Sequence, residues 1–332
     1  MRFGIFGGPS RVTGDDATAY GEFIDMTVEA EQLGFFGVYL VEHHFTGRGQ
    51  LSASLMLLAH LAARTSTIRL GTAVVVVPWH NPLMLAEQAA MVDVLSNGRL
   101  DLGLGRGYRD YEFSGFGIDI DTGQARFEEA VTVLRRAWRD TERFSHDGAY
   151  WHFNDVQVDP RPMQQPHPPL WMGAGSPESI KRVADEGFKL YLDQVGLIDQ
   201  QIERARWYRE AREASEAAGG APYSPRDVIL TRSLRVARDA ADREGLVERQ
   251  MEALTVLAES TRPPSEGGRN LFYSPPEARR ETVEGASIIG TPDECIERLK
   301  RLEAGGIEQV AFAGVTAEQM RLFAKEVMPA FA

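Results

Sequence analysis

The sequence predicts an α/β protein built as a closed (β/α)8 barrel. Eight apolar strands alternate with helices along the chain, and this order is typical of parallel strands joined by helices. The strands are nearly continuous apolar runs, as expected for strands buried on both faces. A length of 332 residues suits one large barrel. A doubly wound open sheet is the alternative, but it should carry a phosphate-binding glycine turn after the first strand, and "GIFGGPS" matches that turn poorly.

The first half of the chain supplies four of the strands. A first helix ends at Gly34, and a later one stops at Asn97-Gly98, as helices commonly do at such residues. The run "IRLGTAVVVVP" is rich in β-branched residues, which favour strands. The predicted strands are 2–6, 37–44, 68–78 and 99–107, and the predicted helices are 20–33, 53–65 and 81–96.

The second half continues the alternation. Its predicted helices are 122–140, 176–187, 199–218, 242–258 and 292–304, followed by a C-terminal helix. Its predicted strands are 169–175, 189–193, 227–237 and 307–314.

Two segments interrupt this pattern. Residues 143–168 predict a hairpin around Asp147-Gly148 followed by a proline-rich connection. Residues 259–286 are rich in proline, glycine and charge, and they predict an irregular, lid-like insertion that is either disordered or an ordered lid. With these insertions, we expect residues 1–332 to form a single domain.

Composition excludes several classes of protein. The net charge of −12 disfavours nucleic acid or an anionic membrane as a partner, since both require a basic surface. No apolar run is long enough to cross a bilayer, and the N-terminus is too short and glycine-rich for a signal peptide. The only cysteine, Cys295, fits a reducing compartment and a packing role. We therefore expect a soluble, cytoplasmic enzyme.

Polar and glycine-rich residues follow the predicted strands, where the chemistry of a (β/α)8 barrel is located. The second and third strands end in "EHH" and "VPWH", and the fourth ends in "GRGY". The fifth and sixth strands end in "GAGS" and "YLDQ". These ends predict the functional site.

Glu42 and His44 form the first candidate group. Successive strand residues point to opposite faces, so these two side chains share one face and His43 takes the other. Adjacent histidines on opposite faces do not readily chelate one ion, and the sequence contains no His-Glu-x-x-His or cysteine cluster. We predict a proton-handling role for at least one histidine and no metal site, against the alternative of hydrogen-bonded structural residues.

Two glycine-containing turns are the next candidates. In "GAGSPES", Ser176 suits an N-cap, Pro177 the first helical position, and Ser179 lies three residues after the cap. This turn either only starts a helix or also binds a phosphate through free N–H groups and hydroxyls. In "GLGRGY", a glycine-lined strand end presents Arg106, and Arg126 could reach the same anion or be an ordinary surface residue.

The chain also resembles a known family. "VEHHF", the block "RTSTIRLGTAVVVVPWHNPLMLAEQAAMVDVLSNGRLDLGLGRGY", "ARFEEAV" and "QQPHPPLWMGAGSPES" are similar to the bacterial luciferase-like, flavin-dependent monooxygenases. The resemblance covers residues 2 to about 195, returns in "GTPDECIERLKRLEAGGIEQVAF", and is weak over 200–285. It implies a (β/α)8 barrel that uses reduced FMN, usually supplied by a separate flavin reductase, and O2. It also implies oxygenation of a small organic substrate through a flavin hydroperoxide.

The resemblance also implies roles for individual residues. His44 would be the proton-handling residue beside the flavin. Glu42, on the same predicted strand face, is the second catalytic candidate, and a closing lid over 259–286 would exclude water from the site. The strand around Thr72 to Val75 would lie against the isoalloxazine, in a region where the family often has a non-proline cis peptide bond. Arg106 and the Gly-Ser turn would hold the phosphate. The implied cofactor-binding residues are Thr72, Ala73, Val74, Arg106, Tyr108, Gly173, Gly175, Ser176, Ser179, Tyr191 and Asp193.

Two other functions remain open on the same barrel. A deazaflavin-dependent oxidoreductase would transfer hydride without activating oxygen, and a non-catalytic flavin-binding protein would only store the cofactor. The organic substrate is not predicted by any motif. Residues 53–64 and 81–96 are apolar over more than one helical face, which together with the family's common pairing predicts a homodimer.

Overall fold

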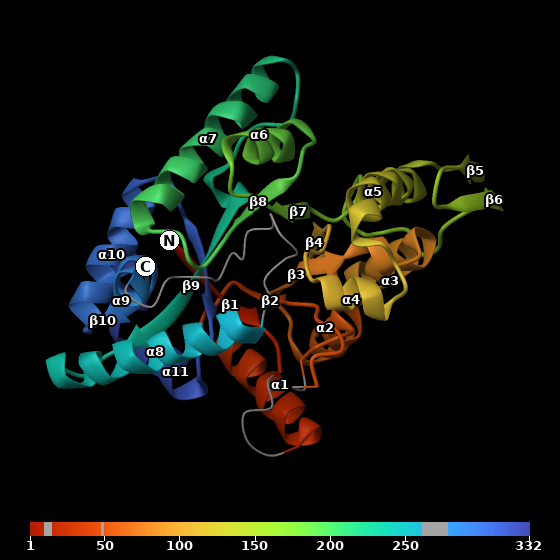
Figure 1. Ribbon diagram of the computed structural model, residues 1–332. Coiled ribbons are helices and arrows are strands. Elements are labelled where there is room, and N and C mark those ends of the chain that lie inside the picture. Colours follow the sequence, from red (N-terminus) through yellow and green to blue (C-terminus); the bar gives the residue numbers. More distant parts are fainter. Residues whose placement is uncertain (10–14, 48–49, 261–277) are drawn as a thin grey trace. The chain divides into compact units, whose positions relative to one another are not determined.

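The computed structural model describes residues 1–9, 15–47, 50–260 and 278–332 (Figure 1). The chain groups into two compact units. One unit, here the N-terminal half-barrel, comprises Gly7–Glu31 and Gly37–Met172. The other, here the C-terminal half-barrel, comprises Met1–Phe6, Gln32–Phe36 and Gly173–Ala332.

The N-terminal half-barrel contains a parallel sheet in the order β2-β3-β4-β7. Its strands are β2 (Gly37–Leu40), β3 (Arg69–Val76), β4 (Leu100–Gly105) and β7 (Leu170–Gly173). Its helices are α1 (Asp16–Gln32), α2 (Ser54–Arg64), α3 (Pro82–Leu95), α4 (Asp110–Gly115) and α5 (Gly123–Arg139), with 3-10 turns at Val77–Trp79 and Ile120–Thr122.

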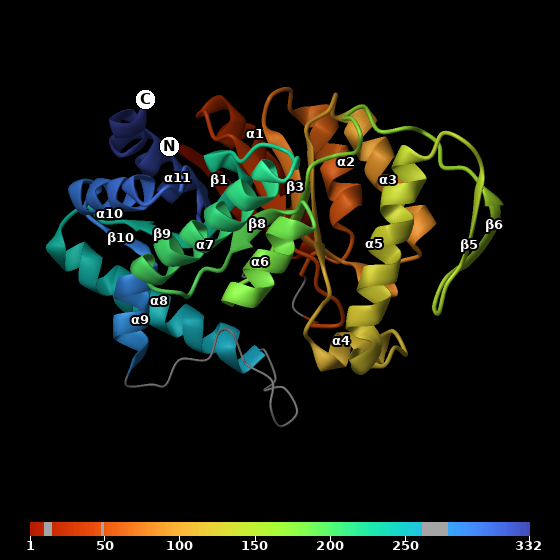
Figure 2. The same ribbon diagram turned by 90° about the horizontal axis from the view of Figure 1, so that it is seen from above.

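The C-terminal half-barrel contains a parallel sheet in the order β8-β9-β11-β1. Its strands are β1 (Arg2–Gly7), β8 (Lys189–Leu192), β9 (Val228–Val236) and β11 (Gln309–Ala313), with the short β10 (Ile288–Gly290) paired to the end of β9. Its helices are α6 (Pro177–Asp185), α7 (Ile198–Ala217), α8 (Ala240–Ser260), α9 (Arg279–Ala286), α10 (Pro292–Ala304) and α11 (Ala317–Glu326), with 3-10 turns at Pro225–Asp227 and Met328–Phe331. Helices α6 and α7 pack side by side (Figures 1 and 2).

The eight strands form the closed order of a (β/α)8 barrel, which confirms the predicted fold class. The two half-barrels contribute four strands each. That the whole chain acts as one domain stays a prediction.

Several element boundaries differ from the sequence prediction. Strand β2 ends at Leu40, so the predicted strand 37–44 is too long, and residues 41–44 are an irregular segment. The predicted irregular insertion is partly helical, because its last residues form α9, and β10 follows directly. Residues 261–277 of the predicted lid lie outside the described residues. Helix α4 was not predicted, because it is only six residues long.

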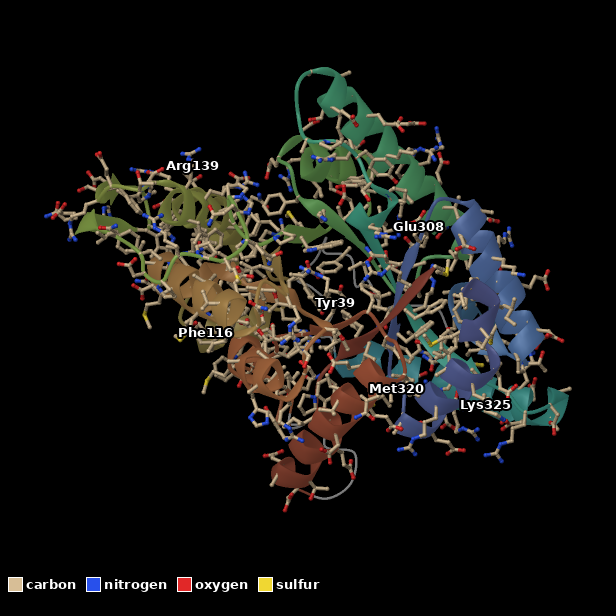
Figure 3. The ribbon with its side chains drawn as sticks, turned by 180° about the vertical axis from the view of Figure 1, so that it is seen from behind. Tyr39, Phe116, Arg139, Glu308, Met320 and Lys325 are labelled. Atoms are coloured by element: carbon tan, nitrogen blue, oxygen red, sulfur yellow. The ribbon has the colours of Figure 1, made fainter. Side chains whose placement is uncertain are left out.

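Small residues in the strands make room for large ones within the N-terminal half-barrel. A Cβ atom on Gly71 would lie 2.3 Å from the ring of Tyr39, and one on Gly105 would lie 2.3 Å from Cγ2 of Val74. Tyr39 lies among the strands (Figure 3), and its hydroxyl donates to Asp101 at 3.4 Å. Asp101 also accepts hydrogen bonds from Arg69, so this carboxylate is buried with partners, as buried charges require.

The predicted hairpin is present as the antiparallel pair β5 (Phe144–Asp147) and β6 (His152–Val156), which extends beyond α5 (Figures 1 and 2). Glu129 of α5 accepts hydrogen bonds from the backbone N–H groups of residues 149–151. A Cβ atom on Gly148 would lie 1.9 Å from this carboxylate, so a larger residue in the predicted Asp-Gly turn would have to displace Glu129. Among the described residues, no helix is both long and apolar enough to cross a membrane.

Candidate active site

Glu42 is the centre of a buried hydrogen-bond network at the end of β2. Its Oε1 atom accepts from Nε1 of Trp79 at 2.8 Å, from Nε2 of His80 at 2.9 Å and from Nε2 of His44 at 3.0 Å. Burial raises the pKa of the Glu42 carboxyl, but the hydrogen bonds from His44, His80 and Trp79 outweigh burial and hold the pKa below its ordinary value. Glu42 is therefore an ionised acceptor near neutral pH.

His43 belongs to a second carboxylate. Its Nδ1 atom lies 3.2 Å from Oε1 of Glu112, the buried acid of α4, and the same oxygen accepts the backbone N–H of His44 at 2.9 Å. Burial lowers the pKa of His43, so this imidazole is neutral near pH 7. The two histidines thus face different carboxylates, as their predicted opposite orientation requires, although the segment is not a regular strand.

Backbone contacts fix this irregular segment on both sides. The N–H of Val41 donates to the carbonyl of Gly7 at 3.0 Å, and the N–H of His43 donates to the carbonyl of Leu51 at 2.9 Å. Phe45 follows with a positive φ of 57°, a conformation that is unfavourable for a side chain of this size. The turn after β2 is therefore held in a defined and locally strained shape.

Aromatic rings surround His44. The imidazole meets the ring of Phe116 at 4.8 Å and that of Trp79 at 5.6 Å, both edge to face. Trp79 stacks on Phe116 at 5.0 Å, and Phe45 packs against Phe116 at the same distance. Phe45 and Phe116 are 59% and 38% exposed. They offer an apolar surface next to a group that can move a proton.

The predicted flavin-side residues of β3 and β4 lie in the same half-barrel. Thr72 is buried and donates to the carbonyl of Gly103 at 2.8 Å, whereas Ala73 and Val74 are partly exposed. The peptide bond between Ala73 and Val74 is cis, which confirms the non-proline cis bond that the resemblance implied. Arg106 and Tyr108 are exposed at the end of β4.

The second candidate group lies in the C-terminal half-barrel. Ser176 caps α6 as predicted: its side chain accepts from the N–H of Ser179 at 3.2 Å, and the Ser179 hydroxyl accepts from the N–H of Ser176 at 3.0 Å. Because Pro177 has no N–H, much of the donor capacity at this helix start is used within the cap. Gly173 and Ser176 are exposed, and Gly175 and Ser179 are partly exposed.

Asp193, predicted to lie near the flavin ring, is held by hydrogen bonds within its own turn and by an arginine of α7. Its carboxylate accepts the N–H groups of Val195 and Gly196 at 2.9 and 2.8 Å and an ion pair from Arg204 of α7 at 2.6 Å. The neighbouring Tyr191 is buried in β8. These contacts give Asp193 a structural role in addition to any role toward a cofactor.

Two arginines of this half-barrel were not predicted. Arg232, fully buried in β9, donates to the carbonyls of Asp193 and Gly196 at 2.9 and 2.7 Å and so fixes the same turn. Nη2 of Arg204 would lie 3.3 Å from a Cβ atom on Gly175, so a glycine at 175 leaves room for this guanidinium beside the Ser176 cap. The sequence gives no local signal for either contact, because each joins elements distant in the chain.

In the N-terminal half-barrel, the sequence missed Glu112 and the aromatic surface of Phe45 and Phe116, and it gave Trp79 and His80 no role. The "VPWH" strand end was the available signal for Trp79 and His80. The described residues contain no group of three or more His, Cys, Asp or Glu side chains that could hold a metal ion.

Comparison with known proteins defines the class. The luciferase-like monooxygenase family model matches residues 1–309. The oxygenase component of the flavin-dependent trigonelline monooxygenase of Acinetobacter baylyi is 28% identical over 100% of this chain and 96% of that protein. The crystal structure of the monooxygenase RslO1 from Streptomyces bottropensis superposes with a TM-score of 0.84 at 28% identity, covering 100% of both chains. An F420-dependent secondary alcohol dehydrogenase, with a TM-score of 0.75 and 18% identity over 100% of this chain and 99% of that one, shows a shared fold alone.

The chain therefore belongs to the luciferase-like monooxygenase family. This result confirms the predicted family and enzyme class.

Proposed function

We propose that this protein is the oxygenase of a flavin-dependent monooxygenase that uses reduced FMN and O2 to oxygenate a small organic substrate. The observation that carries the proposal is His44, which an ionised, buried Glu42 holds beside an exposed aromatic surface. That combination supplies a proton-handling group and a place for an apolar substrate in a barrel of the monooxygenase family.

The exposed residues fit FMN. Ala73 and Val74 present a partly exposed strand on which a flat ring can lie. Among the described residues, the guanidinium of Arg106 makes one long hydrogen bond, to Gln124 at 3.5 Å, and so can pair with an anion. Ser176 and Ser179 would add hydroxyl donors at the start of α6 by giving up the hydrogen bonds that these hydroxyls donate within the cap. When bound, reduced FMN would supply the electron pair that lets one atom of O2 enter the substrate and the other leave as water.

The chain's own residues would control protons and water. His44 would hold or deliver a proton through its ring, and Glu42 would orient that ring by accepting from Nε2. Phe45, Trp79 and Phe116 would exclude water and pack against the substrate. A separate flavin reductase would supply reduced FMN, as the name of the trigonelline enzyme's oxygenase component suggests for that protein.

The test mixes the purified protein anaerobically with reduced FMN and, separately, with a reduced deazaflavin, and measures binding by fluorescence and ultrafiltration. We expect reduced FMN to bind and the deazaflavin to bind much more weakly, and we expect O2 to be consumed when air is admitted to the FMN complex. Preferential binding of the deazaflavin, with no oxygen consumption, would instead support the hydride-transfer alternative. FMN binding without effect on the rate of flavin oxidation would support a storage protein.

We also propose that the protein forms a homodimer through α2 and α3. Met56 of α2 is 76% exposed, and four apolar side chains of α3 are between 45% and 57% exposed, namely Met84, Met91, Val94 and Leu95. Exposed apolar side chains gathered on neighbouring helices are typical of a surface that another subunit covers.

Replacing Met84 and Met91 together by glutamate is expected to turn the dimer into a monomer, because the charges would have to be buried in the interface. Sedimentation velocity at micromolar concentration measures the change. Val256→Glu is the matched control, since Val256 of α8 is similarly exposed at 53% but lies in the other half-barrel. A monomeric parent protein, or a dimer in the double variant, would contradict this assignment.

A further inference from the structure

A single oxygen of Glu42 accepts three hydrogen bonds, and only one of them comes from His44. Trp79 and His80 supply the other two from the turn between β3 and α3, at 2.8 and 2.9 Å. The Glu42 side chain is 1% exposed and that of His80 is 30% exposed. The proposed function uses His44 and Glu42 and leaves Trp79 and His80 without a role in proton handling.

We propose that Trp79 and His80 are positioning residues that keep Glu42 ionised, so that Glu42 holds His44 as the Nε2–H tautomer with Nδ1 available to accept a proton. An ionised carboxylate can only accept hydrogen bonds, so a histidine that shares its Oε1 must donate from Nε2. A neutral imidazole carries one ring proton, and its other nitrogen is then an acceptor.

The charge of Glu42 depends on the N–H groups that donate hydrogen bonds to its carboxylate. A buried carboxylate without sufficient hydrogen bonds takes up a proton, since burial disfavours the charged form. The resulting carboxylic acid would donate a hydrogen bond to Nε2 of His44, and the neutral imidazole would then carry its single proton on Nδ1. Glu42 takes one proton up from solvent, and the imidazole proton moves from Nε2 to Nδ1 by exchange with solvent, so His44 loses its basic Nδ1 atom. Trp79 and His80 prevent the exchange by stabilising the anion.

The other charged groups near this segment are paired with one another. Glu112 accepts from His43 and from the backbone of His44, and Nη1 of Arg109 lies 3.8 Å from the same Glu112 oxygen. Among the described residues, the hydrogen bonds to Glu42 come from Trp79, His80 and His44. Removing the donors of Trp79 and His80 should therefore change the tautomer of His44 through Glu42.

Nitrogen-15 NMR of the imidazole rings in the cofactor-free protein tests the proposal, because protonated and unprotonated ring nitrogens have different chemical shifts. His44 is assigned from the spectrum of His44→Gln. In the parent protein we expect Nε2 of His44 to be protonated at pH 7.5. In the double variant Trp79→Phe/His80→Ala we expect a large fraction of His44 to carry the proton on Nδ1. Trp79→Phe keeps the ring contacts with Phe113 and Phe116 and removes the N–H donor.

Conservative replacement separates positioning from direct proton transfer. His80→Gln retains an N–H donor but cannot be protonated, so we expect it to keep the parent tautomer of His44 and turnover within about threefold of the parent. His80→Ala should lower turnover about tenfold or more, with further loss in the double variant. His152→Ala, which removes a 65% exposed histidine of the hairpin, is the control for any histidine loss.

Two results would overturn the proposal: an unchanged His44 tautomer in the folded double variant, or equal loss of turnover in His80→Gln and His80→Ala. The turnover readout rests on the proposed function, but the tautomer readout does not. A failure of FMN binding in the parent protein would thus refute the proposed function while leaving the NMR test intact.

Discussion

Replacing His44 by alanine is expected to lower product formation by roughly 10²–10⁴-fold, the range for loss of a positioned acid–base group. The variant should still bind reduced FMN, because the residues proposed to hold the phosphate lie on other elements. Oxygen consumption should continue, with hydrogen peroxide replacing oxygenated product. The measurements are product yield and peroxide yield per reduced FMN oxidised.

His43→Ala is the matched control, since it removes the adjacent imidazole. His43 pairs with Glu112 rather than Glu42, and burial lowers its pKa, so it is neutral and packs behind the segment. Its replacement should lower the stability of the fold more than it lowers the yield of oxygenated product per reduced FMN oxidised. Full coupled turnover in His44→Ala together with inactivity of His43→Ala would reverse the two assignments, and full activity of both would make the pair structural.

The second large effect is expected from Arg106→Ala combined with Ser176→Ala. Loss of two proposed phosphate contacts should cost about 2–4 kcal/mol, or roughly 30- to 1,000-fold in FMN affinity. Titration of the folded variant with reduced and oxidised FMN measures this change.

Controls must account for the other roles of these side chains. Ser176 caps α6, and loss of a cap alone costs about 1 kcal/mol of stability. Thr316→Ala removes an equivalent cap, from α11, and should leave FMN affinity unchanged. Arg139→Ala removes a 70% exposed arginine of α5 and serves as the charge control. Unchanged FMN affinity in the double variant would mean that other residues bind the phosphate. Arg204, beside Gly175, would be the first of these to examine.

The barrel could be predicted from the sequence because strand and helix periodicity is a local property. Runs such as "TAVVVVP" have few alternatives to a buried strand, and Ser176-Pro177 has few alternatives to a helix start. Short elements were missed or misjudged: α4 is six residues long, and β2 stops at Leu40. Beyond it, Val41 and His43 donate to the carbonyls of Gly7 and Leu51, contacts that no local pattern predicts.

The candidate site could be predicted only in part. Strand alternation and the family resemblance were enough to assign Glu42 and His44 to one face. Trp79 and His80, the partners of Glu42, and Glu112, the partner of His43, lie 37 to 69 residues further along the chain. A local sequence pattern cannot predict contacts over such separations. The engagement of Asp193 with Arg204 and Arg232 was missed for the same reason.

The placement of the two adjacent histidines on two different carboxylates also constrains how this segment can evolve. A substitution at Val41 changes one side chain, but an insertion or deletion of one residue between Leu40 and Glu42 would shift the following residues of the segment relative to the backbone contacts that hold it. Glu42 and His43 would then lose their alignment with Trp79, His80 and Glu112. Descendants of this sequence should therefore vary here by substitution and keep the length of the segment, while the tip of the β5–β6 hairpin is freer to gain or lose residues outside the turn that Glu129 binds.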